Sequence, residues 1–263
     1  MINLIICGAG GQMGQALIEA CRENPDLAIV GLVESQGHSM VGRKIAETLP
    51  AIVDDLRKVI DKGEVVIDFT SPQASLNNAR TAAGYDKAMV IGTTGLGEDM
   101  IKDLRELSKK IPLLVSSNMS IGVNLLYGFI ARAAKEIPGN FDVEIIETHH
   151  KNKKDAPSGT AKRLLSEIIG GRGGKPVYQR EGLNAPRGGE EIGVVSIRAG
   201  DIVGEHTVVF AGPGERLEFT HRAHGRRVFA EGALAAARFL LQAGPGMYGM
   251  EDVLRNQIQG VDR

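Results

Sequence analysis

The sequence predicts an α/β protein in which a Rossmann-like, doubly wound parallel sheet is joined to a second α+β domain with a mixed, largely open sheet. In the first half, short apolar runs alternate with segments of helical spacing, which indicates parallel βαβ units. These runs are mostly apolar at consecutive positions, as is typical of strands covered on both faces. In the second half, three strand-like runs follow one another with turns between them, which favours an antiparallel or mixed sheet.

The elements of the first half follow in order along the chain. A strand at residues 4–7 leads into a glycine-rich turn at 8–14 and a helix over 15–22. A second helix is expected over 99–110. The other expected strands lie at residues 27–33, 65–69, 89–91 and 112–115.

The second half begins with a long helix over 121–137, bounded by a Pro-Gly pair. A strand at 141–148 and a helix at 158–169 follow it. Residues 170–193 are rich in glycine and charge, and we expect them to form a long loop. The last expected elements are strands at 194–198, 205–210 and 216–221 and a helix at 227–241.

The composition narrows the class of protein. The 263 residues are 43% hydrophobic and 24% charged, as in an ordinary globular protein. A formal net charge of -1 argues against nucleic acid or another polyanion as the partner. No apolar run reaches about 18 residues and the N-terminus lacks a basic signal region, so we expect no membrane association. The two cysteines, Cys7 and Cys21, favour a reducing cytoplasm over a disulfide framework.

The glycine-rich turn and Glu34 together predict a nicotinamide dinucleotide site. The turn follows a strand and opens a helix, so its backbone can approach a pyrophosphate at the helix N-terminus. Its spacing is G-x-x-G-x-x-G, and a plain strand–helix turn with positive φ would use the same glycines. Glu34 ends the second strand about 20 residues later, where a carboxylate can accept both ribose hydroxyls. The candidate cofactor-binding residues here are Gly8, Ala9, Gly10, Gly11, Gln12, Met13 and Glu34.

The residue after Glu34 bears on the choice between NADH and NADPH. A basic side chain there would favour the 2′-phosphate of NADPH, and Ser35 does not supply that charge. Arg43 lies nearby in the sequence and could weaken this argument. We therefore expect NADH to bind at least as well as NADPH.

Two further polar turns follow strands of the predicted parallel sheet. Ligands of such sheets bind beyond the carboxyl ends of the strands, so both turns are candidates for contact with the nicotinamide half of the cofactor. The alternative is a polar turn or a helix cap, with Asn118 or Ser120 capping the helix that follows. The candidate residues are Gly92, Thr93 and Thr94 in one turn, and Ser116, Ser117, Asn118 and Met119 in the other.

The stretch ETHHKNKKDAPSGT at residues 147–160 is dense in proton-carrying and cationic groups. Histidine and a suitably placed lysine can transfer protons, and amides and hydroxyls at a helix start can hold an anion. A small dicarboxylate fits this stretch, and phosphate fits nearly as well. A solvated cationic loop followed by a Ser-Gly-Thr helix cap would look the same. A metal site is disfavoured, because neither cysteine nor an H-E-x-x-H pattern accompanies the histidines.

Two later stretches carry many polar groups without a settled role. Residues 198–207 read RAGDIVGEHT and lie between predicted strands. They could line the substrate face or a subunit contact. Residues 215–227 add two histidines and several arginines.

Seven motifs occur in a characteristic order: GAGGQMG, GTTG, SSNMSIGVN, EIIETHHKNKKDAPSGTA, REG, IGVVSIRAGDIVGEHTV and GERLEFTHRA. Together they resemble the 4-hydroxy-tetrahydrodipicolinate reductase family, long called dihydrodipicolinate reductases, over essentially the whole chain. The resemblance implies NAD(P)H-dependent reduction of a cyclic imine with two carboxylates in the diaminopimelate route to lysine, with loss of water before or during the reduction. It also implies a homotetramer assembled through the second sheet.

The resemblance also assigns roles to residues. His149 would be a proton donor or acceptor and Lys153 the proton donor. The substrate would be held by His150, Gly159 and Thr160, with Ser158 in the same anion pocket. The last helix would return to the first domain, giving a dinucleotide-binding domain of residues 1–120 and 231–263 and a substrate-binding and oligomerisation domain of residues 121–230. Met119 stands where phenylalanine is common in the family, and Ser35 replaces a frequent arginine.

Two other functions would account for some of these sequence features. A nicotinamide-dependent amino-acid dehydrogenase, such as one acting on aspartate, would share the cofactor half, but the paired histidines and the Lys-x-Asp-Ala-Pro-Ser-Gly-Thr run argue against it. A redox-sensing protein with NADH as a ligand would not need an anion pocket beside proton donors, and would usually carry a DNA-reading module.

Overall fold

The computed structural model describes residues 1–182 and 185–261, with side chains described up to residue 256. The chain divides into two compact units. Unit 1 comprises residues 1–121 and 226–263, and unit 2 comprises residues 122–225. The sequence-based boundary at residue 230 falls inside a helix, whereas the structural boundary precedes that helix.

Unit 1 contains a seven-stranded sheet in which every pairing is parallel. The strand order is β12-β6-β5-β4-β1-β2-β3, so the chain leaves β1 toward one edge and returns to its other side with β4. The strands are β1 (Ile2–Cys7), β2 (Leu27–Val33), β3 (Ile52–Val53), β4 (Val65–Asp68), β5 (Ala88–Ile91), β6 (Pro112–Val115) and β12 (Gly246–Tyr248). Together with the mixed sheet of unit 2, this order confirms the predicted doubly wound fold class.

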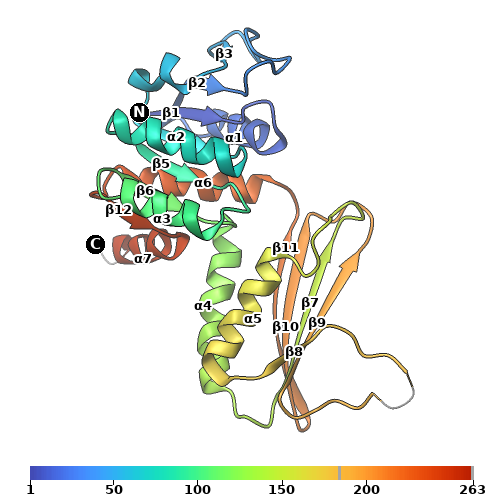
Figure 1. Cartoon of the computed structure of the whole chain (residues 1–263). Coiled ribbons are helices and arrows are strands. Elements are labelled where there is room, and N and C mark those ends of the chain that lie inside the picture. Colours follow the sequence, from blue (N-terminus) through green and yellow to red (C-terminus); the bar gives the residue numbers. More distant parts are fainter. Residues whose placement is uncertain (183–184, 262–263) are drawn as a thin grey trace. The chain divides into compact units, whose positions relative to one another are not determined.

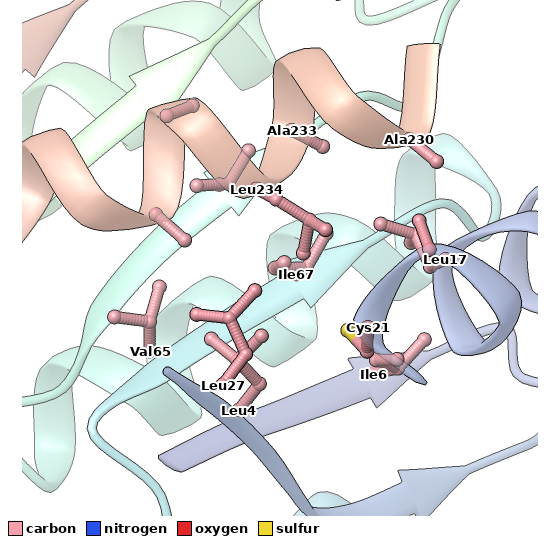
Figure 2. Close-up of a cluster of buried hydrophobic side chains, with 14 of the residues drawn as sticks. Leu4, Ile6, Leu17, Cys21, Leu27, Val65, Ile67, Ala230, Ala233 and Leu234 are labelled. Atoms are coloured by element: carbon pink, nitrogen blue, oxygen red, sulfur yellow. The ribbon is translucent and has the colours of Figure 1, made fainter. Parts of the chain in front are cut away.

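Both faces of this sheet are buried, which explains its consecutive apolar residues. Leu4 and Ile6 of β1 pack with α1 (Gln12–Arg22), α6 (Arg227–Leu240) and α7 (Met250–Val261). Figure 2 shows Leu17 of α1 and Leu234 of α6 pointing toward Ile67 of β4 in this cluster. Ile5 and Cys7, the alternate residues of β1, pack on the opposite face with α2 (Pro72–Gly84) and α3 (Glu98–Leu107).

The boundaries of several elements in unit 1 differ from the sequence-based expectation. Helix α1 begins at Gln12 and not at residue 15. Gly14 lies in the first turn of this helix, where the absence of a side chain allows close packing against the preceding glycine-rich turn. Helix α2 was not predicted, although Pro72 at its first turn is a usual start signal. Strands β3 and β12 are too short for a sequence pattern to reveal. Two 3₁₀ turns, Leu56–Lys58 and Ile60–Lys62, precede β4.

Unit 2 packs two helices on one face of a five-stranded mixed sheet. The helices α4 (Ile121–Glu136) and α5 (Gly159–Arg172) lie side by side over the strands (Figure 1) and bury residues such as Leu126, Leu164 and Phe210. The sheet order is β11-β10-β7-β9-β8, with β10 antiparallel to both neighbours and the other pairs parallel. The strands are β7 (Asp142–His149), β8 (Lys175–Val177), β9 (Glu191–Arg198), β10 (Gly204–Gly212) and β11 (Glu215–Ala223).

The predicted loop at 170–193 is partly structured. It contains β8 and the first residues of β9, which pair with each other. The edge strand β8 is only three residues long and contains Pro176, so its existence depends on the neighbouring strand and not on its own sequence.

The face of the second sheet opposite α4 and α5, here called the outer face, carries exposed apolar side chains. Val195 and Ile197 of β9 are 44% and 43% exposed. No helix in the part of the chain that the structure describes has both the length and the apolarity needed to cross a membrane.

Candidate active site

The glycine-rich turn lies at the carboxyl end of β1, beside the point where the strand order reverses. Gly8 has a φ of +84°, and a Cβ on it would lie 2.5 Å from the Phe69 carbonyl oxygen. A Cβ on Gly14 would lie 2.2 Å from the Gly8 carbonyl oxygen. Only glycine therefore allows α1 and β4 to approach the turn this closely. Gly11, the N-cap residue directly before α1, places no side chain over the first amides of the helix.

Glu34 is joined to this turn by hydrogen bonds. Its Oε1 accepts from the Gly10 amide at 2.8 Å, and its Oε2 accepts from the Ser35 amide at 3.0 Å. A cavity of about 610 Å³ within unit 1 is lined by Gly8, Gly11 and Glu34, and also by Ser35. The structure thus brings the glycine-rich turn and Glu34 to one cavity.

The turn after β5 is fixed by a buried carboxylate, Asp68 at the end of β4. Asp68 Oδ1 accepts from the Thr93 hydroxyl at 3.0 Å and from the Ser75 hydroxyl at 2.5 Å. Its Oδ2 accepts from the Asn78 side-chain Nδ2 at 2.7 Å. Thr93 is only 6% exposed, whereas Thr94 beside it is exposed. Of the two threonines, Thr94 has the accessible side chain, and Thr93 can offer a cofactor little beyond its backbone.

The turn after β6 is held largely by its own hydrogen bonds. The Ser116 hydroxyl donates to the Asn118 carbonyl at 2.8 Å, and the Ser120 amide donates to Asn118 Oδ1 at 2.9 Å. Met119 is 1% exposed and packs in the core with α6, while Ser117 is exposed. This geometry resembles the helix-cap alternative for Asn118, and it leaves Ser117 as the most accessible side chain of the turn.

In unit 2, a cluster of buried polar side chains surrounds Glu147, near the end of β7. Glu147 is fully buried, and His149, Ser158 and His206 are 8%, 2% and 3% exposed. His149 Nδ1 lies 2.5 Å from Glu147 Oε2, and Arg198 donates from two nitrogens to the two carboxylate oxygens at 2.8 Å each. This cluster is here called the Glu147 cluster.

Electrostatics in the Glu147 cluster favour an ionised carboxylate beside neutral imidazoles. Burial opposes ionisation of Glu147, but hydrogen bonds from Arg198, Ser196, His149 and the Ser158 amide lower its pKa to about 2. Burial lowers the pKa of His149, although Glu147 partly offsets this effect. Burial, together with the nearby His149, lowers the pKa of His206 to about 3.

The loop between β7 and α5 carries Lys153, whose side chain is 22% exposed and forms an ion pair with Asp155 at 2.8 Å. His150, also in this loop, is half-buried. Ser158 caps α5, because its hydroxyl accepts from the Ala161 amide at 3.1 Å. The same hydroxyl lies 3.0 Å from His206 Nε2, so the Ser158 side chain is occupied within the protein. Gly159 and Thr160, the first two residues of α5, remain at the surface or half-buried.

Comparison with known proteins decides the family. The model of dihydrodipicolinate reductase, N-terminus, matches residues 2–119, and the model of dihydrodipicolinate reductase, C-terminus, matches residues 122–254. The chain belongs to the dihydrodipicolinate reductase family. This confirms the sequence-based resemblance and makes the protein an oxidoreductase that uses a nicotinamide cofactor.

Individual relatives agree with this assignment. The 4-hydroxy-tetrahydrodipicolinate reductase of Citrifermentans bemidjiense is 43% identical, and the alignment covers 97% of this chain and 99% of the relative. The one from Hahella chejuensis is 45% identical over the same shares. Among solved structures, the dipicolinate-bound dihydrodipicolinate reductase from Paenisporosarcina sp. TG-14 matches with a TM-score of 0.80 at 25% identity, covering 95% of this chain and 97% of that one.

Within this dihydrodipicolinate reductase fold, sequence reasoning missed the buried groups that support the predicted site residues. Glu147 could have been found, because β7 alternates buried and half-exposed residues and places Glu147 on the buried face with His149. Arg198 and His206 were left open between a substrate face and a subunit contact, and the structure places both in the Glu147 cluster. Asp68 could not have been found in the same way, because a single aspartate at the end of an apolar strand has no distinctive pattern around it.

Proposed function

We propose that unit 1 holds a nicotinamide dinucleotide through its glycine-rich turn and Glu34, and that Lys153 protonates the substrate. The reaction is that of the family: the protein is a 4-hydroxy-tetrahydrodipicolinate reductase of lysine biosynthesis. The assignments of individual residues below are our proposals. The aspartate-type dehydrogenase alternative is not retained, since both halves of the chain match reductase models.

The residues of unit 1 fit a dinucleotide. When bound, the cofactor supplies the hydride. A Cβ on Gly8 or Gly14 would meet a neighbouring carbonyl oxygen, so glycine keeps the turn and α1 tightly packed. A backbone without side chains at positions 8, 11 and 14 can also approach a pyrophosphate. Glu34, which lines the same cavity, can accept hydrogen bonds from ribose hydroxyls. Thr94 and Ser117 are the side chains of the two later turns best placed to reach a ligand, since both are exposed.

The groups around Glu34 favour NADH. Ser35 contributes no positive charge to the cavity, which is also lined by Asp54 and Asp55. The one arginine among the lining residues, Arg57, is paired with Asp55. A 2′-phosphate would meet carboxylates with little compensation, so we propose that NADH is used at least as well as NADPH.

The substrate is proposed to bind at the start of α5. The Paenisporosarcina relative was solved with dipicolinate, which carries two carboxylates on one ring. In this chain the first residues of α5, Gly159 and Thr160, can present backbone amides to a carboxylate, and His150 lies on the loop that precedes them. Ser158 contributes by holding the helix start in place, because its side chain already caps the helix.

Lys153 is the proposed proton donor. Hydride addition leaves negative charge on the substrate, which a positioned acid must neutralise. The ammonium of Lys153 is partly buried, and Asp155 holds it at 2.8 Å on the same loop as His150. This arrangement of an oriented ammonium immediately before an anion-binding helix start is the observation that carries the proposal.

Assembly is proposed to use the outer face of the second sheet. That face exposes Val195 and Ile197, and it also carries both members of the Glu205–Arg222 ion pair. Apolar groups mixed with charges of both signs suit a second copy of the same surface, and a homotetramer is the proposed state. Light scattering after gel filtration measures it, and a monomeric mass would contradict it. A reducing cytoplasm is the proposed compartment, because Cys7 and Cys21 are both free and buried.

The experiment that tests the proposed function is a coupled assay. Freshly synthesised 4-hydroxy-tetrahydrodipicolinate is supplied with NADH, and consumption of NADH is followed by its absorbance. Oxaloacetate with ammonia serves as the control substrate pair. Turnover of the cyclic imine without turnover of oxaloacetate supports the proposal, and the reverse result would overturn it.

A further inference from the structure

Glu147 is a buried carboxylate for which the reduction chemistry described above has no use. A buried charge is costly unless it is paired and hydrogen-bonded, and Glu147 is both. Its Oε1 accepts from Arg198 Nη2 at 2.8 Å and from the Ser158 amide at 3.1 Å. Its Oε2 accepts from Arg198 Nη1 at 2.8 Å and lies 2.5 Å from His149 Nδ1. Four polar contacts, from three residues, therefore converge on one side chain.

These contacts determine which nitrogen of His149 carries its proton. An ionised carboxylate can only accept hydrogen bonds, so a nitrogen 2.5 Å from Glu147 Oε2 must be the one that bears hydrogen. Arg198 spans both oxygens of Glu147 and so prevents the carboxylate from turning away. We propose that Glu147 is a positioning residue that holds His149 with its proton on Nδ1 and leaves Nε2 as an acceptor, so that Lys153 is the acid of the reaction.

The acid role of Lys153 in this inference rests on the proposed function. The position of the His149 proton, which Glu147 determines, does not. It also resolves an alternative that the sequence left open, namely whether His149 donates or accepts. A neutral imidazole with hydrogen on Nδ1 has only a lone pair to offer at Nε2. The lowered pKa of His149, caused first by burial, agrees with a neutral ring.

The surroundings of His149 Nε2 are consistent with a functional nitrogen. A Cβ on Gly204, the first residue of β10, would lie only 3.0 Å from this atom. A side chain at position 204 would therefore crowd Nε2, and glycine avoids this contact. The ring of His206 packs edge-on against His149, with centroids 5.1 Å apart, and limits its rotation.

Arg198 connects the proposed acceptor with the proposed donor. Beyond its two bonds to Glu147, its Nη2 donates to the Asp155 carbonyl at 2.6 Å. The Asp155 side chain in turn holds Lys153. One guanidinium thus fixes both the carboxylate behind His149 and the loop that carries Lys153.

The first test reads the tautomer directly. Full-length protein containing ¹⁵N-histidine is measured by long-range ¹H–¹⁵N correlation at neutral pH, and the His149 signals are identified by their loss in His149→Asn. The expected result is hydrogen on Nδ1 in the wild type and a mixture of tautomers in Glu147→Gln. Hydrogen on Nε2 in the wild type would overturn the inference.

The second test separates positioning from mere stability. Glu147→Gln is expected to lower kcat by about tenfold or more while leaving the KM for NADH unchanged. Glu144→Gln is the matched control, because Glu144 lies on the same strand and pairs with arginine, but faces away from His149. It should retain kcat within about twofold. Equal losses in the two variants would contradict a positioning role.

The third test uses pH. The charged or titratable groups that act on His149 are Glu147 on its own strand, Arg198 on β9, His206 on β10 and Lys153 on the following loop. If Nε2 of His149 must be unprotonated for activity, the acidic limb of kcat/KM against pH reports the protonation of His149. The Glu147 charge raises the pKa of His149, so Glu147→Gln should lower that pKa and move the acidic limb to lower pH. An unmoved limb would count against the inference.

Arg198→Lys provides a further variant for the tautomer measurement. It keeps the positive charge but can no longer bind both oxygens of Glu147, and it should show a partial loss of the tautomer preference. That readout remains available if Glu147→Gln fails to fold.

The outcomes distinguish this inference from the proposed function. A wild type that turns over no cyclic imine overturns the function but not the tautomer measurement. An active wild type whose His149 carries hydrogen on Nε2 overturns the inference alone.

Discussion

The Thr93 hydroxyl donates a hydrogen bond to Asp68 at 3.0 Å, although Thr93 belongs to the turn after β5 and Asp68 ends the neighbouring strand β4. The same carboxylate accepts from Ser75 and Asn78 of α2. Asp68 therefore ties two strand ends and a helix together beneath a turn that is proposed to meet the nicotinamide half of the cofactor.

Thr93→Val should lower the free energy of unfolding by about 1–3 kcal/mol, because it leaves Asp68 with one donor fewer in a buried place. It should also raise the KM for NADH, since the turn loses its tie to β4. The neighbouring Thr94→Val is the control: Thr94 is exposed, and its substitution should change stability by no more than about 0.5 kcal/mol. Urea unfolding and steady-state kinetics measure both effects. Similar losses of stability in the two variants would contradict this role for Asp68.

Gly14→Ala should impair NADH binding. The added methyl would lie 2.2 Å from the Gly8 carbonyl oxygen and 2.7 Å from the Ala9 Cα, both rigid backbone atoms, so α1 must move away from the turn. Overpacking of this kind costs about 1–3 kcal/mol, which corresponds to roughly a 5- to 150-fold loss of affinity if it falls on the binding conformation. Gly97→Ala, at the start of α3 with open space around it, should bind NADH normally. Calorimetric titration with NADH compares the two.

The parallel sheet could be predicted from the sequence because burial on both faces leaves long apolar strands with nothing to obscure them. The strands that were not predicted from the sequence are too short to give such an apolar run. The edge strands β3, β8 and β12 have two or three residues each, and their pairing depends on neighbours that are distant in sequence.

In the candidate site, too, the features that could be predicted are local in sequence and the features that were missed are not. Glycines, the acidic strand end and the His-His-Lys stretch are local patterns, and their chemistry can be inferred from residue types. The partners that orient them are not local. Arg198 is 51 residues from Glu147, and His206 is 48 residues from Ser158, so only the fold brings each pair together.

Ser35→Arg should shift cofactor use toward NADPH. The cavity beside Glu34 is lined by carboxylates, and a guanidinium at position 35 would offer a 2′-phosphate a bidentate partner. The ratio of kcat/KM for NADPH to that for NADH should rise by about tenfold. Gln36→Arg adds the same charge at the next exposed position, which does not line this cavity, and should leave the ratio nearly unchanged. A wild type that already strongly prefers NADPH would refute the basis of this prediction.

Lys153→Met should lower kcat by about 10²–10⁴ with little change in NADH affinity, because a positioned acid contributes roughly that much to the rate. Lys154→Met is the matched control, since Lys154 is the adjacent lysine and its side chain is exposed. Single-turnover measurements at saturating substrate separate the chemical step from binding. Turnover within a few-fold of wild type in Lys153→Met would mean that another group supplies the proton.

His206 should make the protein less stable as the pH falls below neutrality. Burial, together with His149, lowers its pKa from 6.5 to about 3, with smaller contributions from His221 and Lys153 and with Glu147 acting in the opposite direction. Between these values the unfolded chain binds a proton that the folded chain does not, so the free energy of unfolding rises with pH throughout this window. One pKa unit corresponds to about 1.4 kcal/mol, and the full effect is on the order of 5 kcal/mol.

Urea unfolding at fixed protein concentration between about pH 7.5 and 5 measures this dependence. Glu147 contributes little in that range, because its lowered pKa removes stability only between about 4.5 and 2. His206→Gln should reduce the slope of unfolding free energy against pH by nearly one proton at about pH 5, and by much less above about pH 7. The slope that remains belongs to His149 and His221, whose pKa values burial also lowers. If His206→Gln keeps the wild-type slope, His206 is not the group that resists protonation in the folded protein.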